Sequence, residues 1–92
     1  MLPLNYAILQ LFLNEETADV TLVMDRLADR YGKFRQFTPK AITEALMTAE
    51  ANDLLEETGF ELDETGQLRV YYRASESGRA MISRYIGGAD PA

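Results

Sequence analysis

The stretch LRVYYRASESGRAMISRYI, residues 68–86, changes its hydrophobic period halfway along and decides the fold. Up to Ala74, apolar residues alternate with arginines, which is the period of two that a β-strand requires. After Ser75, apolar residues recur at helical spacing, and a serine hydroxyl placed there accepts from the first turn of a helix. The sequence therefore predicts a strand that runs directly into a short last helix, closed by Gly87 and Gly88.

The strand has a partner immediately before it in the chain. Residues 54–62 have the pattern of a strand with an irregularity around Gly59, and residues 63–66 (DETG) place a glycine where a turn needs positive φ. The sequence thus predicts a hairpin of residues 54–62 and 67–74. Its returning strand has an apolar face made of Leu68, Val70, Tyr72 and Ala74, and a solvent face made of Arg69, Tyr71 and Arg73.

Two helices are predicted in the first third of the chain. The first carries its apolar face on Leu4, Ala7, Ile8, Leu11 and Phe12. We expect the hydroxyl of Thr21 to cap the second helix and Gly32, in the left-handed conformation, to end it. Residues 18–20 are expected to add a brief edge strand.

The third helix is predicted from the pair Thr38 and Pro39, a hydroxyl cap followed by a proline in the first turn. Asn52 is the expected left-handed residue at its exit. The inner stripe of this helix is Ile42, Ala45, Leu46 and Ala49, and its outer side is Lys40, Thr43, Glu44, Met47 and Thr48.

Three helices, a hairpin and a short last helix, in this order, describe a winged helix. The predicted fold class is therefore α+β, mostly α. We expect one domain over residues 1–88, because 92 residues have no room for two cores, and a disordered tail over residues 89–92.

Several segments resemble the PadR-like transcriptional regulators. These segments are AILQLFL, ITEALMTAEANDLLEE and RVYYRASESGRAMISRY, which fall within residues 6–86. The most specific element is the set Tyr71, Tyr72, Ser75, Gly78 and Arg79. The resemblance implies a winged helix that binds DNA and regulates transcription. The chain departs from that family in having no long C-terminal helices, a longer connection before the third helix, and an acidic block over residues 44–64.

Composition excludes several kinds of site. The chain has no cysteine and no histidine, so disulfides, thiolate zinc sites, cysteine nucleophiles and histidine bases are absent. The neighbouring carboxylates lie at loops and element ends, and no glycine-rich phosphate loop occurs, so we expect no enzyme, no cofactor and no metal site. The apolar start, MLPLNYAILQLFLNEE, lacks the basic flank of a signal peptide and the length of a membrane span, which predicts a cytoplasmic protein.

Charge is unevenly distributed and leaves two kinds of partner open. The net charge is −6, but residues 26–40 are basic while residues 44–64 carry eight acids and no base. For double-stranded DNA, cations near the third helix and on the wing would hold phosphates, and outer residues of the helix would face base edges. The candidate DNA contacts are Arg35, Thr38, Lys40, Thr43, Met47, Arg69 and Arg73.

Two other interpretations stand beside DNA. The arginines of a soluble domain ordinarily pair with its own surface acids, and Glu44 on the outer side of the third helix would repel phosphate. An acidic winged helix with exposed Met47 and Tyr71 also suits a protein partner. A homodimer is expected through a second apolar face of the first helix, Tyr6, Leu9 and Leu13, unless the last helix covers it.

Overall fold

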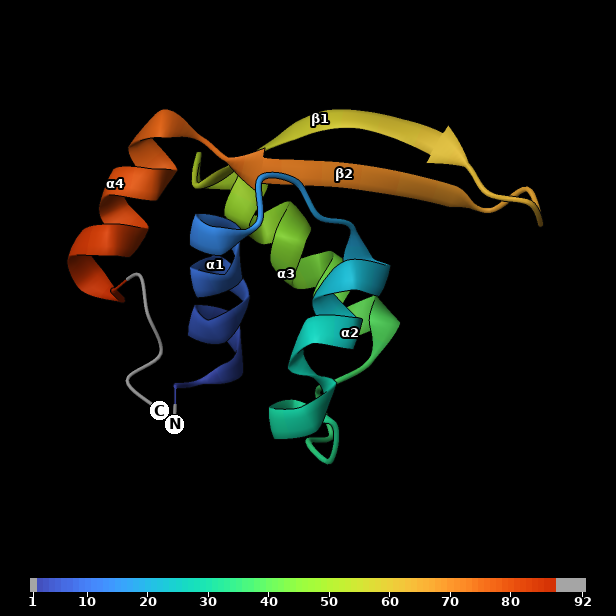
Figure 1. The fold of residues 1–92 in the computed structure, drawn as a ribbon, viewed down its shortest axis with the longest axis horizontal. Coiled ribbons are helices and arrows are strands. Elements are labelled where there is room, and N and C mark those ends of the chain that lie inside the picture. The colour runs from blue at the N-terminus through green and yellow to red at the C-terminus, as the bar shows by residue number, and fades with distance from the viewer. Residues whose placement is uncertain (1, 88–92) are drawn as a thin grey trace.

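The computed structural model describes residues 2–87, and it has the predicted α+β, mostly helical, winged-helix layout (Figure 1). Three helices come first, followed by an antiparallel hairpin and a last helix. Gly88 and the predicted tail, residues 89–92, lie outside the described residues. The elements are α1 (Leu4–Asn14), α2 (Val20–Tyr31), α3 (Pro39–Ala51), β1 (Leu55–Leu62), β2 (Leu68–Ala74) and α4 (Glu76–Tyr85).

One apolar core joins the first three helices to the near end of the hairpin. The apolar faces predicted for α1 and α3 point into it, and the largest fully buried side chains come mainly from the first three helices, with one each from β1 and α4. Tyr31 is completely buried, and its hydroxyl donates to the carbonyl of Leu2. Each large side chain buried in this way contributes about 1.5–3 kcal/mol. The fully buried set is Tyr31, Phe12, Ile8, Leu27, Ile42, Leu46, Leu55, Ile82 and Val23.

The ends of the helices confirm some predicted caps and correct others. Thr38 accepts from the amide of Ala41 at 3.1 Å with Pro39 next to it, as predicted. The prediction that Thr21 caps α2 is wrong: the cap lies two residues earlier, at Asp19, whose carboxylate accepts from the amide of Leu22 at 3.0 Å. A carboxylate at this position also complements the positive end of the helix dipole.

Two predictions of left-handed backbone are also wrong. Gly32 ends α2 with φ −58°, in the right-handed region, because the chain continues into a turn in which the amide of Phe34 donates to Tyr31. After α3 the left-handed residue is Asp53, with φ 63°, and Asn52 has φ −95°. The amide of Leu54 then donates to the carbonyl of Ala49, which closes the helix end one residue later than expected.

The hairpin forms with the predicted turn and with an irregularity at the predicted place. The two strands pair antiparallel from Leu55–Ala74 to Leu62–Leu68, with a register shift between Glu57 and Gly59. Gly66 has φ 83°, which a turn glycine adopts without strain. The predicted edge strand at residues 18–20 is a single bridge, in which Ala18 and Tyr72 exchange two hydrogen bonds of 2.9 Å.

Only the near half of the hairpin closes the core. Tyr72 and Ala74 are buried as predicted, whereas Leu68 is 56% exposed although it belongs to the same face. The physical reason is that the far half of β1 and β2 extends past the helices into solvent (Figure 1). The strand pattern predicts which face is apolar, but it does not predict how far the helices reach beneath it.

Helix α4 packs beside α1, on the side away from α2 (Figure 1). Ser75 caps it as predicted, accepting from the amide of Gly78 at 2.8 Å. The guanidinium of Arg79 donates to the carbonyls of Leu13 and Phe12 at 3.3 and 3.5 Å, so it supplies positive charge to the C-terminal end of α1. The last helix is therefore bonded to the C-terminal end of α1.

This contact bears on the residues proposed for a dimer. Leu9 and Leu13 are half-buried within the single chain, and Tyr6 is 50% exposed. Leu9 lies beside α3, where it lines a small pocket with Ala41 and Ala45, so part of this face is covered within the single chain. The homodimer itself stays a prediction. None of the helices among residues 2–87 has the length and apolar content that crossing a membrane requires.

Candidate functional site

The outer side of α3 and the hairpin border an open groove of about 810 Å³. Helix α3 supplies Thr43 and Met47, and Leu46 lies deeper in the groove. The hairpin supplies Leu68 and Val70 from its apolar face. A recognition helix and a wing would contact a ligand at this surface, which makes it the natural candidate site of the fold.

The groove combines apolar walls with negative charge. Four carboxylates line it, those of Asp19, Glu50, Glu57 and Asp63. Among the described residues that line the groove, Arg69 is the one basic side chain. Glu50 and Glu57 form no ion pair among residues 2–87, so their charge is directed to solvent in the groove.

Arg69 forms an ion pair within the protein. Its guanidinium lies 2.7 Å from the carboxylate of Asp19, which is buried at the start of α2. The hydrogen bond and the charge of Asp19 raise the pKa of Arg69 above its ordinary value. The guanidinium also lies 5.8 Å from the centre of the Tyr71 ring. This ion pair joins β2 to the start of α2. The positive charge of Arg69, which was expected to contact DNA, is therefore neutralised by Asp19.

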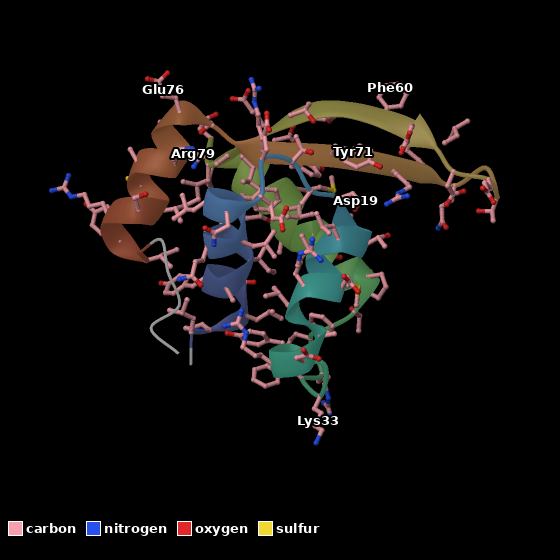
Figure 2. The ribbon with its side chains drawn as sticks, viewed as in Figure 1. Asp19, Lys33, Phe60, Tyr71, Glu76 and Arg79 are labelled. Carbon is pink, nitrogen blue, oxygen red and sulfur yellow. The ribbon has the colours of Figure 1, made fainter. Side chains whose placement is uncertain are left out.

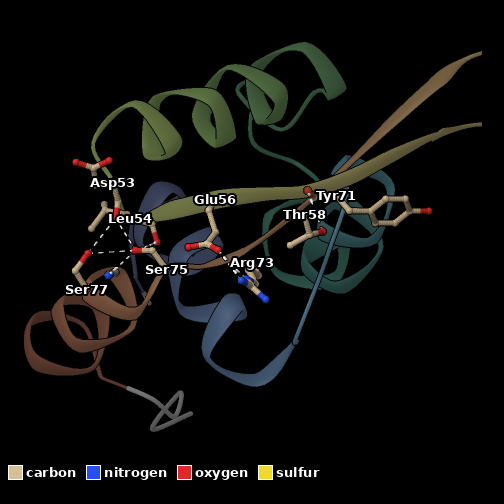
Figure 3. A network of polar contacts seen from close by, with 9 residues as sticks. Asp53, Leu54, Glu56, Thr58, Tyr71, Arg73, Ser75 and Ser77 are labelled. Atoms are coloured by element: carbon tan, nitrogen blue, oxygen red, sulfur yellow. Dashed lines mark hydrogen bonds and ion pairs between the residues drawn. The ribbon is translucent and has the colours of Figure 1, made fainter.

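Tyr71 and Arg73 are likewise held by acids of the neighbouring strand. The hydroxyl of Tyr71 donates to the carboxylate of Glu61 at 2.6 Å, and this bond raises the pKa of Tyr71 above its ordinary 10.0. Arg73 donates two hydrogen bonds to Glu56, at 2.7 and 2.9 Å (Figure 3). For Arg69 and Arg73, the interpretation that wing arginines pair with the protein's own acids is therefore confirmed.

The outer residues of α3 are exposed as predicted, but the hydroxyls of two threonines near its start are engaged. Thr43 donates to the carbonyl of Pro39 at 2.8 Å, and Thr38 serves as the helix cap. Met47 is 56% exposed and lines the groove. Lys40 is exposed at the start of the helix, and it is not part of the groove.

The basic segment lies away from the groove. Lys33 and Arg35 are exposed in the connection between α2 and α3. Figure 2 shows Lys33 at the end of the molecule opposite the hairpin. The structure thus brings Thr43, Met47 and Arg69 together at the groove, and it leaves Arg35, Lys40 and Arg73 outside it.

Sequence reasoning missed most of the residues that define the groove. Glu50, Glu57 and Asp63 belong to the acidic block that was noticed only as a difference from DNA-binding proteins. That block was the available signal, because three of its members line the groove, Glu50 from α3 and Glu57 and Asp63 from the hairpin. Asp19 had no such signal, since its partner Arg69 is 50 residues away in the chain.

Comparisons with known proteins assign no family. No protein-family model matches the chain, and no curated protein matches it significantly. The resemblance to PadR-like regulators therefore stays a prediction. Among residues 2–87, no group of three or more potential acidic metal ligands comes together.

The wing turn should make the stability of the protein depend on pH. Asp63 accepts from the hydroxyl of Thr65 at 2.7 Å and from the amides of Gln67 and Thr65, each at 2.9 Å. These bonds lower the pKa of Asp63 below its ordinary 3.8, with the Thr65 hydroxyl acting most strongly. A lowered pKa gives stability that is present above the unfolded value and is lost as pH falls through the folded value.

Replacing Asp63 with alanine should therefore make the stability of the fold less dependent on pH in the acid range. We expect the unfolding midpoint of Asp63→Ala to fall less steeply than that of the wild type below about pH 4. Thermal unfolding followed by circular dichroism at closely spaced pH values measures this difference. Glu64→Ala, at the adjacent turn position, is the control. Equal acid slopes for the wild type and Asp63→Ala would contradict the prediction.

Proposed function

We propose that this chain is a winged-helix interaction module that binds a protein partner in the groove between α3 and the hairpin. The single observation that carries the proposal is the charge of that groove. Four carboxylates line it, and its arginine is already paired with Asp19. A DNA backbone placed there would meet like charge, whereas phosphate attraction supplies much of the affinity of ordinary DNA-binding proteins.

The apolar surface of the groove supports the same proposal. Met47 and Leu68 are each 56% exposed and lie on opposite walls. Methionine adapts to irregular apolar partners, and apolar contacts of this kind form the centre of protein interfaces. Carboxylates around such a centre steer and select a partner of opposite charge.

A DNA-binding transcriptional regulator is the second candidate. It is favoured by the exposed cations Lys33, Arg35 and Lys40, which lie before and at the start of α3. A helix N-terminus with neighbouring cations is a suitable place for a phosphate. These cations are not continuous with Arg69 and Arg73 on the hairpin, which are bound to Asp19 and Glu56. For this reason we place DNA second.

A duplex titration separates the two functions. We expect no saturable binding of a fluorescently labelled 30-base-pair duplex at low salt, up to about 100 µM protein, the weak end of ordinary non-specific affinity. Fluorescence anisotropy measures this. Saturable binding that weakens steeply with salt and is lost in both Lys40→Glu and Arg73→Glu would overturn the proposal and establish the DNA function.

A further inference from the structure

We propose that the occupant of the groove is a short amphipathic helix of a partner protein, with lysine or arginine beside its apolar face. This inference rests on the proposed function and specifies the chemistry of the partner. It is argued from the extent of the apolar surface, from the unpaired carboxylates, and from the charge of the chain as a whole.

The apolar surface extends beyond the groove along the far half of the hairpin. Phe60 pairs with Val70 across the strands, and Leu62 pairs with Leu68. Cross-strand partners project to the same side of a sheet, so all four share one face. Phe60 and Leu62 are 69% and 68% exposed. An elongated strip therefore runs from Met47 on α3 to the hairpin tip, and it matches the long apolar stripe of a helix.

The carboxylates stand beside this strip. Glu57 is opposite Tyr72 in the hairpin, and Glu50 projects from the last turn of α3. Neither forms an ion pair among the residues from Leu2 to Gly87. A partner that is only apolar would partly cover these charges and leave them without compensation. A partner that presents cations next to its apolar residues would pair with them instead.

A second copy of the chain is a poorer occupant. Each copy carries a net charge of −6, so association is opposed by repulsion between copies. Its basic connection between α2 and α3 packs Phe34 against the ring of Tyr31, at 5.2 Å between centres, and so presents a bent loop. A regular apolar stripe with flanking cations fits the strip better than this loop.

A synthetic peptide tests the inference with the intact chain. The probe is a labelled 14-residue peptide of leucine and lysine with leucine at helical spacing. One control has the same composition in a scrambled order without a helical stripe, and another has glutamate in place of lysine. At physiological salt we expect saturable 1:1 binding of the probe by anisotropy, about tenfold weaker binding of the scrambled peptide, and none of the glutamate peptide.

Matched variants locate the site. Glu57→Lys should weaken binding of the probe about tenfold, whereas Glu44→Lys, the same change of charge on α3 outside the groove, should leave it within about twofold. Met47→Gln should weaken binding about tenfold, and Met81→Gln on α4 should not. Circular dichroism melts confirm that each variant is folded, since all four residues are exposed.

Three outcomes would overturn the inference. The first is absence of probe binding, and the second is equal loss of binding in Glu57→Lys and Glu44→Lys. The third is a mass by light scattering that rises with protein concentration and is reduced by Met47→Gln, which would identify a second copy as the occupant. None of these results depends on the duplex titration, so failure here and binding of DNA are distinguishable.

Discussion

Replacing Gly78 with alanine should lower the free energy of unfolding by about 3 kcal/mol, near the upper end of the ordinary cost of overpacking. Gly78 is buried in the first turn of α4, directly against the chain that leads into β1. A Cβ at this position would overlap the backbone carbonyl of Leu54. That carbonyl accepts from the amide of Ser75 at 3.0 Å, so it cannot move without breaking the junction between hairpin and helix.

Thermal unfolding measures the effect, and Gly59→Ala is the matched control. A loss of this size should lower the midpoint by more than about 10 °C in a domain of this length. At Gly59 an added Cβ would meet nothing within 4 Å, and φ is not positive, so the same substitution should have little effect. If Gly78→Ala melted within about 2 °C of Gly59→Ala, the close approach of α4 to Leu54 would be refuted.

The second large effect is expected at Asp19. Asp19→Ala removes the cap of α2 and the partner of Arg69 together, and it should lower the free energy of unfolding by about 2 kcal/mol. The carboxylate is buried and accepts from both Leu22 and Arg69, at 3.0 and 2.7 Å. Urea unfolding followed by circular dichroism gives this loss directly.

Two further variants separate the roles of Asp19. Asp19→Asn keeps an oxygen that can cap the helix and removes the charge, so its loss should be smaller than that of alanine. Asp29→Ala changes the same residue type at an exposed position of α2 and should stay within about 0.5 kcal/mol of the wild type. A result in which Asp19→Ala resembles Asp29→Ala would show that neither contact stabilises the fold.

The order of helices and hairpin could be predicted because each element is determined by residues that are close together in the sequence. The alternation of residues 68–74, the DETG turn and the hydroxyl of Ser75 each predict one element from neighbouring residues alone. Caps were harder, since Thr21 and Asp19 are both good capping residues and lie two positions apart. Which one serves depends on where α2 begins, and the contact of Asp19 with Arg69 favours the earlier start.

The candidate site was only partly predictable. Exposure of Lys40, Thr43 and Met47 follows from the helical period of α3 and was predicted correctly. The pairing of Arg69 with Asp19, and the meeting of Glu50 with Glu57 in one groove, join residues that are distant in the chain or lie in different elements. Counting charges along the sequence does not reveal these contacts, although they determine that the groove carries negative charge.

The register shift between Glu57 and Gly59 exchanges the two faces of β1: beyond it, residues of the opposite alternation point to the core side of the sheet. If the two strands paired without this shift, Leu55 would still oppose Ala74, but Gly59 would oppose Val70 and Glu61 would oppose Leu68. With it, Phe60 and Leu62 take those places. Deleting Thr58 would remove the bulge and keep these pairs, because Thr58 is the residue that the pairing of the two strands leaves out. Pairing Thr58 with Tyr71 instead would exchange the apolar tip for a charged one. In a related chain, a change of one residue in the length of this part of the strand would keep the tip apolar only if the bulge were lost or a second one gained with it.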